Sequence, residues 1–389
     1  MQKRSTYILV LALCATCAMI WAAMRAVTAS AHVPGSSQRW NPQSAALYLD
    51  EREVWWQKWP PAQMDHGTVC ISCHTVVPYA LVRSSLRRRL SEGKMTSPEQ
   101  LMLASIKKRV AEWSETTPYY TDEVNGAGKS AESHSTEAVL NAAILSSYDQ
   151  GQGQLSPISL EAFNEAWALQ ETTGADAGGW KWQNFHLAPW ESSESAYQGA
   201  ALMAVVLGEA PGNYASQAQV RDHLELLKQY LRRQYDEQPL MSKLYVLWAS
   251  ARNPGLLTEA EKSELVGKVA SVQLNDGGWA LSSLDAQSRK HAMVDEWKRL
   301  SNTGESDGCA TGLTVLAMEK AGASQHEDAL RRGVEWLKEH QAKDGSWWAT
   351  SLNGQRDTKS DIGRFMSDAA TGYAVLALEN ADQVNSESK

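Results

Sequence analysis

The feature that most constrains this chain is an internal repeat over residues 130–381. Three stretches end a helix-like segment in glutamine, pass through a glycine turn and reach tryptophan, at 169–182, 273–279 and 341–348. The last two begin QLNDGGW and QAKDGSW. A unit of this kind buries its apolar face only by stacking on its neighbours, so the repeat decides the architecture.

Two kinds of helix are predicted around each turn. The segments 258–273 and 326–341 are charged on one face and apolar on the other, as expected for outer helices. The segments 194–208, 306–318 and 367–378 are small and apolar nearly all round, as expected for buried helices. The alternation predicts an all-α fold of two concentric rings, an α/α toroid. We count five helix pairs, at 98–148, 158–208, 217–251, 258–321 and 325–381, with the N-terminal helices as candidates for a sixth.

These turns and helices resemble the superfamily of squalene–hopene cyclases and protein prenyltransferase β-subunits. The resemblance covers about residues 130–381. It implies a toroid in which the glutamine of each turn ties one outer helix to the next, and Gln273 with Trp279 and Gln341 with Trp347 match this pattern. The copy at 170–180 departs from the pattern because its turn is longer.

The catalytic motifs of that superfamily are matched only in part. Hopene cyclases protonate an alkene with an Asp-x-Asp-Asp motif, and this chain has no Asp-Asp pair. Prenyltransferases bind zinc through Asp-x-Cys and a later histidine; Asp307 and Cys309 match the first part, but Asp368 stands at the later position. We expect Cys309 to be a small buried residue and do not expect zinc. A zinc-dependent or acid-catalysed prenyl or terpenoid enzyme remains an alternative.

Acidic residues mark the start of the predicted inner helices. Asp307, Asp368, Glu194 and Glu132 precede related positions of the copies, and we align Asp307 with Asp368 at a spacing of 61 residues. The first three are candidate catalytic residues, on a rim of carboxylates around a central cavity. Helix capping is the favoured alternative, since an acidic group suits the positive end of a helix.

A second motif, Cys70-Ile71-Ser72-Cys73-His74, precedes the repeats. Two thiols at this spacing can bond the two vinyl groups of haem while the adjacent histidine ligates the iron. The motif is similar to those of c-type cytochromes, which implies covalent haem c with Cys70 and Cys73 as anchors and His74 as the proximal iron ligand. A structural or redox-active cysteine pair and half of a zinc site are the alternatives. The distal position is either open or filled by one of four candidates: Met64, His66, Met95 and His134.

The N-terminus has the layout of an export signal. Basic residues precede an apolar run at 7–24, and small residues up to Ala31 offer a cleavage site. The run is also long enough to anchor the chain in a membrane, so residues 1–31 are predicted as a signal peptide or an anchor. Either outcome makes the protein periplasmic or otherwise extracytoplasmic. We divide the remainder into a helical haem segment at 32–125, the toroid at 130–381 and a disordered tail at 382–389.

Charge and loops add three expectations. The net charge of −8 argues against a nucleic-acid partner. The arginine-rich segment at 83–90 is either a set of partners for haem propionates or a solvated basic face. The insertion at 349–365 is either a lid or docking loop near the cavity, or a solvated loop.

Together these features predict an exported c-type haem protein with a terpenoid-cyclase-like toroid. We expect it to serve electron transfer or haem-dependent oxidation of an apolar, isoprenoid-like ligand, with a redox protein or an apolar small molecule as its partner. A haem-carrying scaffold without turnover is the alternative, and the residues leave open whether the protein is an enzyme.

Overall fold

The computed structural model describes residues 40–285, 304–323, 327–349 and 356–387; the chain divides into two units after residue 38, and the second, 39–389, contains all the described residues. The predicted signal or anchor, with the apolar run at 7–24, lies outside the described residues. None of the helices that are described is long and apolar enough to cross a membrane. The second unit is built from helices, and its described residues contain isolated β-bridges but no strand.

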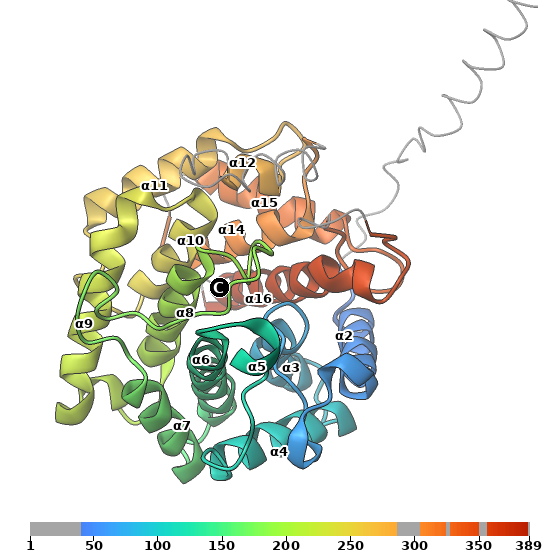
Figure 1. Ribbon diagram of the computed structural model, residues 1–389. Coiled ribbons are helices and arrows are strands. Elements are labelled where there is room, and N and C mark those ends of the chain that lie inside the picture. Colours follow the sequence, from blue (N-terminus) through green and yellow to red (C-terminus); the bar gives the residue numbers. More distant parts are fainter. Residues whose placement is uncertain (1–39, 286–303, 324–326, 350–355, 388–389) are drawn as a thin grey trace, which may run out of the picture. The chain divides into compact units, whose positions relative to one another are not determined.

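The helices of this unit form two concentric rings (Figure 1). Within the described residues the inner ring has six members: α3 (Val76–Arg89), α6 (Lys129–Asp149), α8 (Ser195–Glu209), α10 (Leu240–Ser250), α14 (Gly308–Lys320) and α16 (Phe365–Glu387). The outer helices are α2 (Pro42–Lys58), α4 (Ser97–Ala111), α7 (Pro157–Ala168), α9 (Ala218–Gln234), α11 (Glu259–Ser271) and α15 (Glu327–Glu339). Successive inner helices pack on one another, and α16 packs on α3, so the inner ring is closed. The predicted all-α toroid is confirmed.

Short helices lie in the connections between these pairs. They are η1 (Pro60–Ala62), η2 (Asp65–Gly67), α5 (Asp122–Asn125), η3 (Tyr214–Ser216), η4 (Tyr235–Glu237), α12 (Leu281–Asp285) and η6 (Ile362–Arg364). The first two precede the cysteine motif, and η6 leads directly into α16.

The N-terminal helices α2 and α3 complete the sixth pair. α3 fills the gap between α16 and α6, while α2 packs on α3, α4 and α16. The described helices of the segment at 32–125 belong to the same compact unit as the repeats. At the other end, α16 continues to Glu387, so the helix extends into the segment 382–389 that was predicted as a tail.

The glutamine of each turn binds the backbone of the next outer helix. Gln273 Nε2 donates to the carbonyl oxygens of Gly277 and Ala329, both at 2.8 Å, and Ala329 belongs to α15. In the divergent copy, Gln170 Nε2 donates to Gly178 O at 3.0 Å and to His223 O in α9 at 3.1 Å. These bonds are the link between outer helices that the resemblance implies. The longer turn that begins at Gln170 makes the same link.

The last turn closes the ring onto the N-terminal helix. Gln341 Nε2 donates to Asn41 O at 3.0 Å, and Asn41 N donates back to Gln341 Oε1 at 2.6 Å. Asn41 is the N-cap of α2, where its side chain accepts from Ser44 N at 3.1 Å. Gly345 has φ of +93°, and a Cβ atom there would lie 2.1 Å from Ser44 O. This contact requires glycine on both conformational and steric grounds.

The inner helices approach one another closely because their facing residues are small. A Cβ atom on Gly312 of α14 would lie 2.6 Å from Ala374 N of α16. The turn tryptophans are anchored on this layer: Trp279 N donates to Thr311 Oγ1 at 2.9 Å and Trp347 N to Thr371 Oγ1 at 3.1 Å. Each turn is thereby fastened to the start of its own inner helix.

Candidate functional site

The cysteine–histidine motif lies directly before α3, at the beginning of an inner helix. Cys70, Cys73 and His74 line one cavity of about 240 Å³. The aromatic residues that share this cavity are Trp56, Trp59, Tyr120, Trp190 and Phe365, and the polar or sulfur-bearing ones include Gln183, Glu191, Arg356 and Met366. Residues from both ends of the chain therefore meet in one site.

Hydrogen bonds fix the backbone of the motif. Ser72 Oγ accepts from Thr75 N at 3.2 Å and from Val76 N at 3.0 Å, which satisfies two free amides at the start of α3. Trp56 Nε1 donates to Cys70 O at 2.8 Å and ties the motif to α2. The motif is thus held between an inner and an outer helix.

Cys70 and Cys73 are free thiols in this cavity. Burial raises the pKa of both thiols well above the ordinary range, and the nearby Glu191 carboxylate adds to the effect. Redox-active cysteine pairs depend on a lowered thiol pKa, because the thiolate is the nucleophile. The environment does not favour a thioredoxin-like role for this pair.

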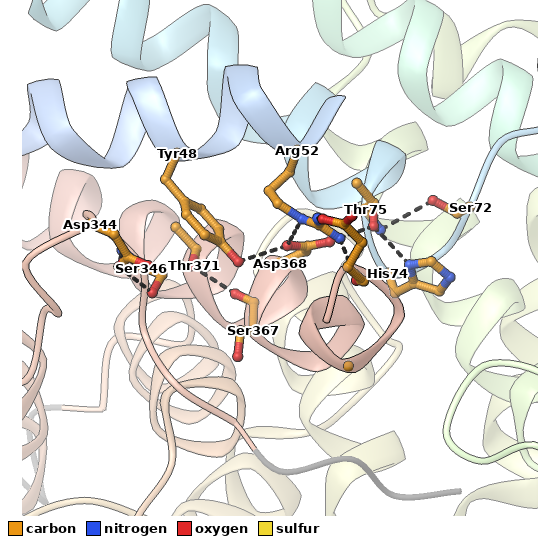
Figure 2. Close-up of polar contacts among 12 residues, drawn as sticks. Tyr48, Arg52, Ser72, His74, Thr75, Asp344, Ser346, Ser367, Asp368 and Thr371 are labelled. Atoms are coloured by element: carbon orange, nitrogen blue, oxygen red, sulfur yellow. Dashed lines mark hydrogen bonds and ion pairs between the residues drawn. The ribbon is translucent and has the colours of Figure 1, made fainter. Parts of the chain in front are cut away.

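His74 is held in one tautomer by its neighbours (Figure 2). Its Nδ1 atom lies 2.8 Å from Thr75 Oγ1, and the Thr75 hydroxyl donates to Asp368 Oδ2 at 2.7 Å. A hydroxyl has one hydrogen, so Thr75 Oγ1 must accept from Nδ1–H. Nε2 then carries the lone pair, and Figure 2 shows this nitrogen pointing away from Thr75.

Burial lowers the pKa of His74 to about 3, with Arg52 and Arg356 adding to the shift. The imidazole is therefore neutral near pH 7. Aromatic rings hold its plane: Phe365 stacks on it at 3.8 Å between centroids, and Trp56 and Trp190 lie at 5.2 and 5.7 Å. A neutral imidazole with a free Nε2 is the form that ligates a metal.

Asp368 is fully buried behind the histidine. Its Oδ1 atom accepts from Tyr48 Oη and Arg52 Nε, each at 2.8 Å. Arg52 continues to Asp361, donating to Oδ1 at 2.8 Å and to the backbone oxygen at 2.7 Å. Asp361 belongs to the 349–365 insertion, so the described part of that loop is fastened to α2.

The alignment of Asp368 with Asp307 is wrong by one residue. Asp307 Oδ2 accepts from Leu281 N at 2.7 Å, and the equivalent bond in the next repeat runs from Ala349 N to Ser367 Oγ at 3.3 Å. Ser367 therefore occupies the place of Asp307. Asp368 stands one residue further on, inside α16, where its carboxylate turns toward α2 and the motif.

The other acidic candidates lie outside the cavity. Asp307 is the N-cap of α14 and accepts from Cys309 N and Ala310 N, both at 2.9 Å, which confirms capping for this residue. Glu194 accepts from the hydroxyl of Ser192 at 3.0 Å. Cys309 is fully buried in α14. No three His, Cys, Asp or Glu side chains gather around a possible metal position in the part of the chain that the structure describes.

None of the four distal-ligand candidates lines the cavity. Met64 is partly buried against the core, and Met95 is 39% exposed. His66 Nδ1 lies 2.7 Å from Glu112 Oε2, and the His134 ring stacks on Trp113. The methionine that does line the cavity is Met366, which sequence reasoning missed because only ring closure brings α16 beside the motif.

The arginine-rich segment lies at the far end of α3 from His74. At 1.5 Å per residue, the last turn of α3 is roughly 20 Å from its start. Arg83 Nε donates to Asp50 at 2.9 Å and Arg87 Nε to Glu99 at 3.4 Å. The arginine that lines the cavity is Arg356, from the 349–365 insertion.

The donor set of the cavity fits a c-type haem. It combines two thiols, a neutral imidazole with a free Nε2, aromatic walls and one arginine. The volume of about 240 Å³ is below the roughly 300–1,000 Å³ of pockets that enclose a drug-sized ligand. The cavity could therefore enclose part of a haem.

A second, smaller cavity lies beside the first. It is lined by Leu202, Tyr245 and Tyr373 among others, measures about 30 Å³ and shares Cys73 and Trp190 with the first. This is roughly the volume of one water molecule. The two tyrosine hydroxyls are hydrogen-bonded to each other at 2.6 Å.

The closed double ring and its glutamine–tryptophan turns define a terpenoid-cyclase-like α/α toroid. Residues 257–360 and 308–389 match the family model of the squalene-hopene cyclase C-terminal domain, so the last repeats are similar to that domain. A solved polysaccharide lyase is 13% identical, with 90% of this chain and 91% of that chain covered and a TM-score of 0.37. No curated protein matches the chain.

Proposed function

We propose that this protein is an exported c-type haem protein in which the toroid holds a covalently attached haem at the start of an inner helix. One observation carries the proposal: Cys70, Cys73 and the neutral His74 line the same cavity. When bound, the haem supplies one-electron redox chemistry, and an open iron position would add oxygen chemistry.

The residues around the cavity have distinct roles in this proposal. Cys70 and Cys73 attach the porphyrin, and His74 ligates the iron through Nε2. Phe365, Trp56 and Trp190 hold the imidazole and exclude water. Arg356 lines the cavity and would pair with a propionate by a charge-assisted hydrogen bond. The signal peptide or anchor predicted at 1–31 is consistent with the assignment, since c-type haem is attached outside the cytoplasm.

Electron transfer is the function that we favour. The second cavity, of about 30 Å³, is too small for an isoprenoid, so of these two cavities only the larger one could bring an apolar substrate beside the haem. Met366 lines that cavity, and we propose it as the distal ligand in place of the four candidates found in the sequence. Two protein ligands favour electron transfer over catalysis.

Producing the full-length chain in a bacterial host that attaches c-type haem tests this proposal. We expect a Soret band and haem that stays on the polypeptide in a denaturing gel. Cys70→Ala with Cys73→Ala should abolish this covalent haem. Cys309→Ala is the matched control, because that buried thiol lies outside the cavity and its loss should leave the haem in place. Wild-type protein without covalent haem would contradict the proposal.

A further inference from the structure

Asp368 has no counterpart in the neighbouring repeat. Ser367 takes the place of Asp307 in the repeat, because it accepts the equivalent backbone bond from the residue two positions after the turn tryptophan. The Asp368 carboxylate is therefore free of the capping role. It is fully buried and points away from its own helix toward α2 and the motif (Figure 2).

A continuous hydrogen-bond chain connects this carboxylate to the imidazole. Nδ1–H of His74 donates to Thr75 Oγ1 at 2.8 Å, and the Thr75 hydroxyl donates to Asp368 Oδ2 at 2.7 Å. Tyr48 and Arg52 donate hydrogen bonds to the other carboxylate oxygen of Asp368, Oδ1. The carboxylate therefore has a fixed orientation, with one oxygen dedicated to Thr75.

We propose that Asp368 is a positioning residue that acts through Thr75 to set the tautomer and the donor strength of His74. This inference rests on the proposed haem function and deepens it. An iron-ligating histidine is oriented by the hydrogen bond of its second ring nitrogen, and a carboxylate behind it raises its basicity. A more basic ligand stabilises the oxidised iron over the reduced iron, and thereby lowers the midpoint potential.

The charges around Asp368 preserve this effect. The network contains one guanidinium, Arg52, and two carboxylates, Asp368 and Asp361, with Arg52 bonded to both. Asp361 is half-exposed, whereas Asp368, the carboxylate that is bonded to Thr75, is fully buried. Burial weakens screening by solvent, so this hydrogen bond acts more strongly on the ligand than one to an exposed carboxylate would.

A redox titration of the haem-loaded full chain tests the inference. We expect Asp368→Asn and Thr75→Val each to raise the midpoint potential, with a tenfold change in the relative stability of the two oxidation states giving about 59 mV. Thr75→Ser keeps the hydroxyl and should restore the wild-type value. Asp307→Asn is the matched control, because it removes a buried carboxylate that caps an inner helix without contacting His74.

The outcomes separate the two levels of the proposal. Equal potentials in wild type, Asp368→Asn and Thr75→Val overturn the inference while leaving the haem function intact. A shift of equal size in Asp307→Asn overturns it too, because the effect would then be a general consequence of losing a buried charge. Absence of haem from the wild type refutes the proposed function itself.

The tautomer is measurable without haem. In haem-free protein, nitrogen-15 NMR of the histidine rings should show His74 protonated on Nδ1, where free histidine favours Nε2. Thr75→Val should mix the two tautomers, and Thr75→Ser should not. A wild-type ring protonated on Nε2 would contradict the hydrogen-bond chain whether or not haem attaches.

Discussion

Gly345→Ala should destabilise the protein by opening the ring where it closes. The glycine has φ of +93°, and a Cβ atom would lie 2.1 Å from Ser44 O at the start of α2. Left-handed backbone in an L-residue costs about 1–2 kcal/mol. Carbon and oxygen atoms pack no closer than about 3.3 Å, so α2 must retreat by roughly 1 Å, and overpacking of this kind costs about 1–3 kcal/mol more. We expect a total loss of about 3 kcal/mol.

Two other glycines supply a graded control for this value. Gly277 occupies the same position of the preceding turn with φ of +95°, but its Cβ would meet its nearest neighbour, Arg332 O, at 3.0 Å. Gly322 has φ of +68° and nothing within 4 Å. Alanine at Gly322 should therefore cost about 1 kcal/mol from conformation alone, and at Gly277 slightly more.

Urea denaturation followed by circular dichroism measures the series. The expected order of destabilisation is Gly345→Ala, then Gly277→Ala, then Gly322→Ala. Gly345→Ala should also disturb the hydrogen bonds to Asp368, because α2 carries Tyr48 and Arg52. Equal losses at all three positions would refute the reasoning, since they would show that the contact with α2 carries no energy.

Three further predictions concern the site and its support. Arg109→Met should lower the free energy of unfolding, measured by urea denaturation, by about 3–5 kcal/mol, because it leaves the fully buried carboxylate of Glu137 without its ion-pair partner. A loss below about 1 kcal/mol would contradict this. In haem-free protein, the lowered pKa of His74, about 3, means that only the unfolded chain takes up this proton as the pH falls below 6.5. Stability is thus lost on acidification, and His74→Phe should remove up to about 2 kcal/mol of that loss at pH 5; unchanged pH dependence would refute it. Met366→Ala should convert the loaded protein to a form that binds CO rapidly, and rapid binding by the wild type would show that Met366 is no ligand.

Much of the fold could be predicted from local patterns. The contrast between half-charged helices and all-round apolar ones indicates two layers, and the turn motif indicates how the layers repeat. The link made by Gln273 followed from the resemblance, and the structure adds that the divergent Gln170 makes it as well. The sequence pattern does not predict that the ring closes through Gln341 and Asn41. The helix α2 has no copy of the turn motif, so nothing in the pattern marks it as the neighbour of α15.

The candidate site, like the fold, can be predicted from the sequence only in part. Cys70, Cys73 and His74 are adjacent in the chain, so their shared chemistry is visible in the sequence. Asp368 is a candidate in the sequence as well, but the residues that bond to it, Tyr48, Arg52 and Thr75, cannot be identified there. A shift of one residue decides whether an acidic side chain caps its own helix or leaves it. Thr311-Gly312 and Thr371-Gly372 are 60 residues apart, so alignment on these pairs places Ser367, and not Asp368, opposite Asp307.

The repeat, the two classes of helix and the cysteine–histidine motif are visible in the amino-acid sequence, because each depends on residues within a few positions of one another. The residues that lie behind and beside the motif become visible only in the folded chain. Ring closure brings α16 and the 349–365 insertion against α2 and α3, and so places Asp368, Met366 and Arg356 around His74. These contacts join residues almost 300 positions apart, and their geometry depends on the packing of the whole ring.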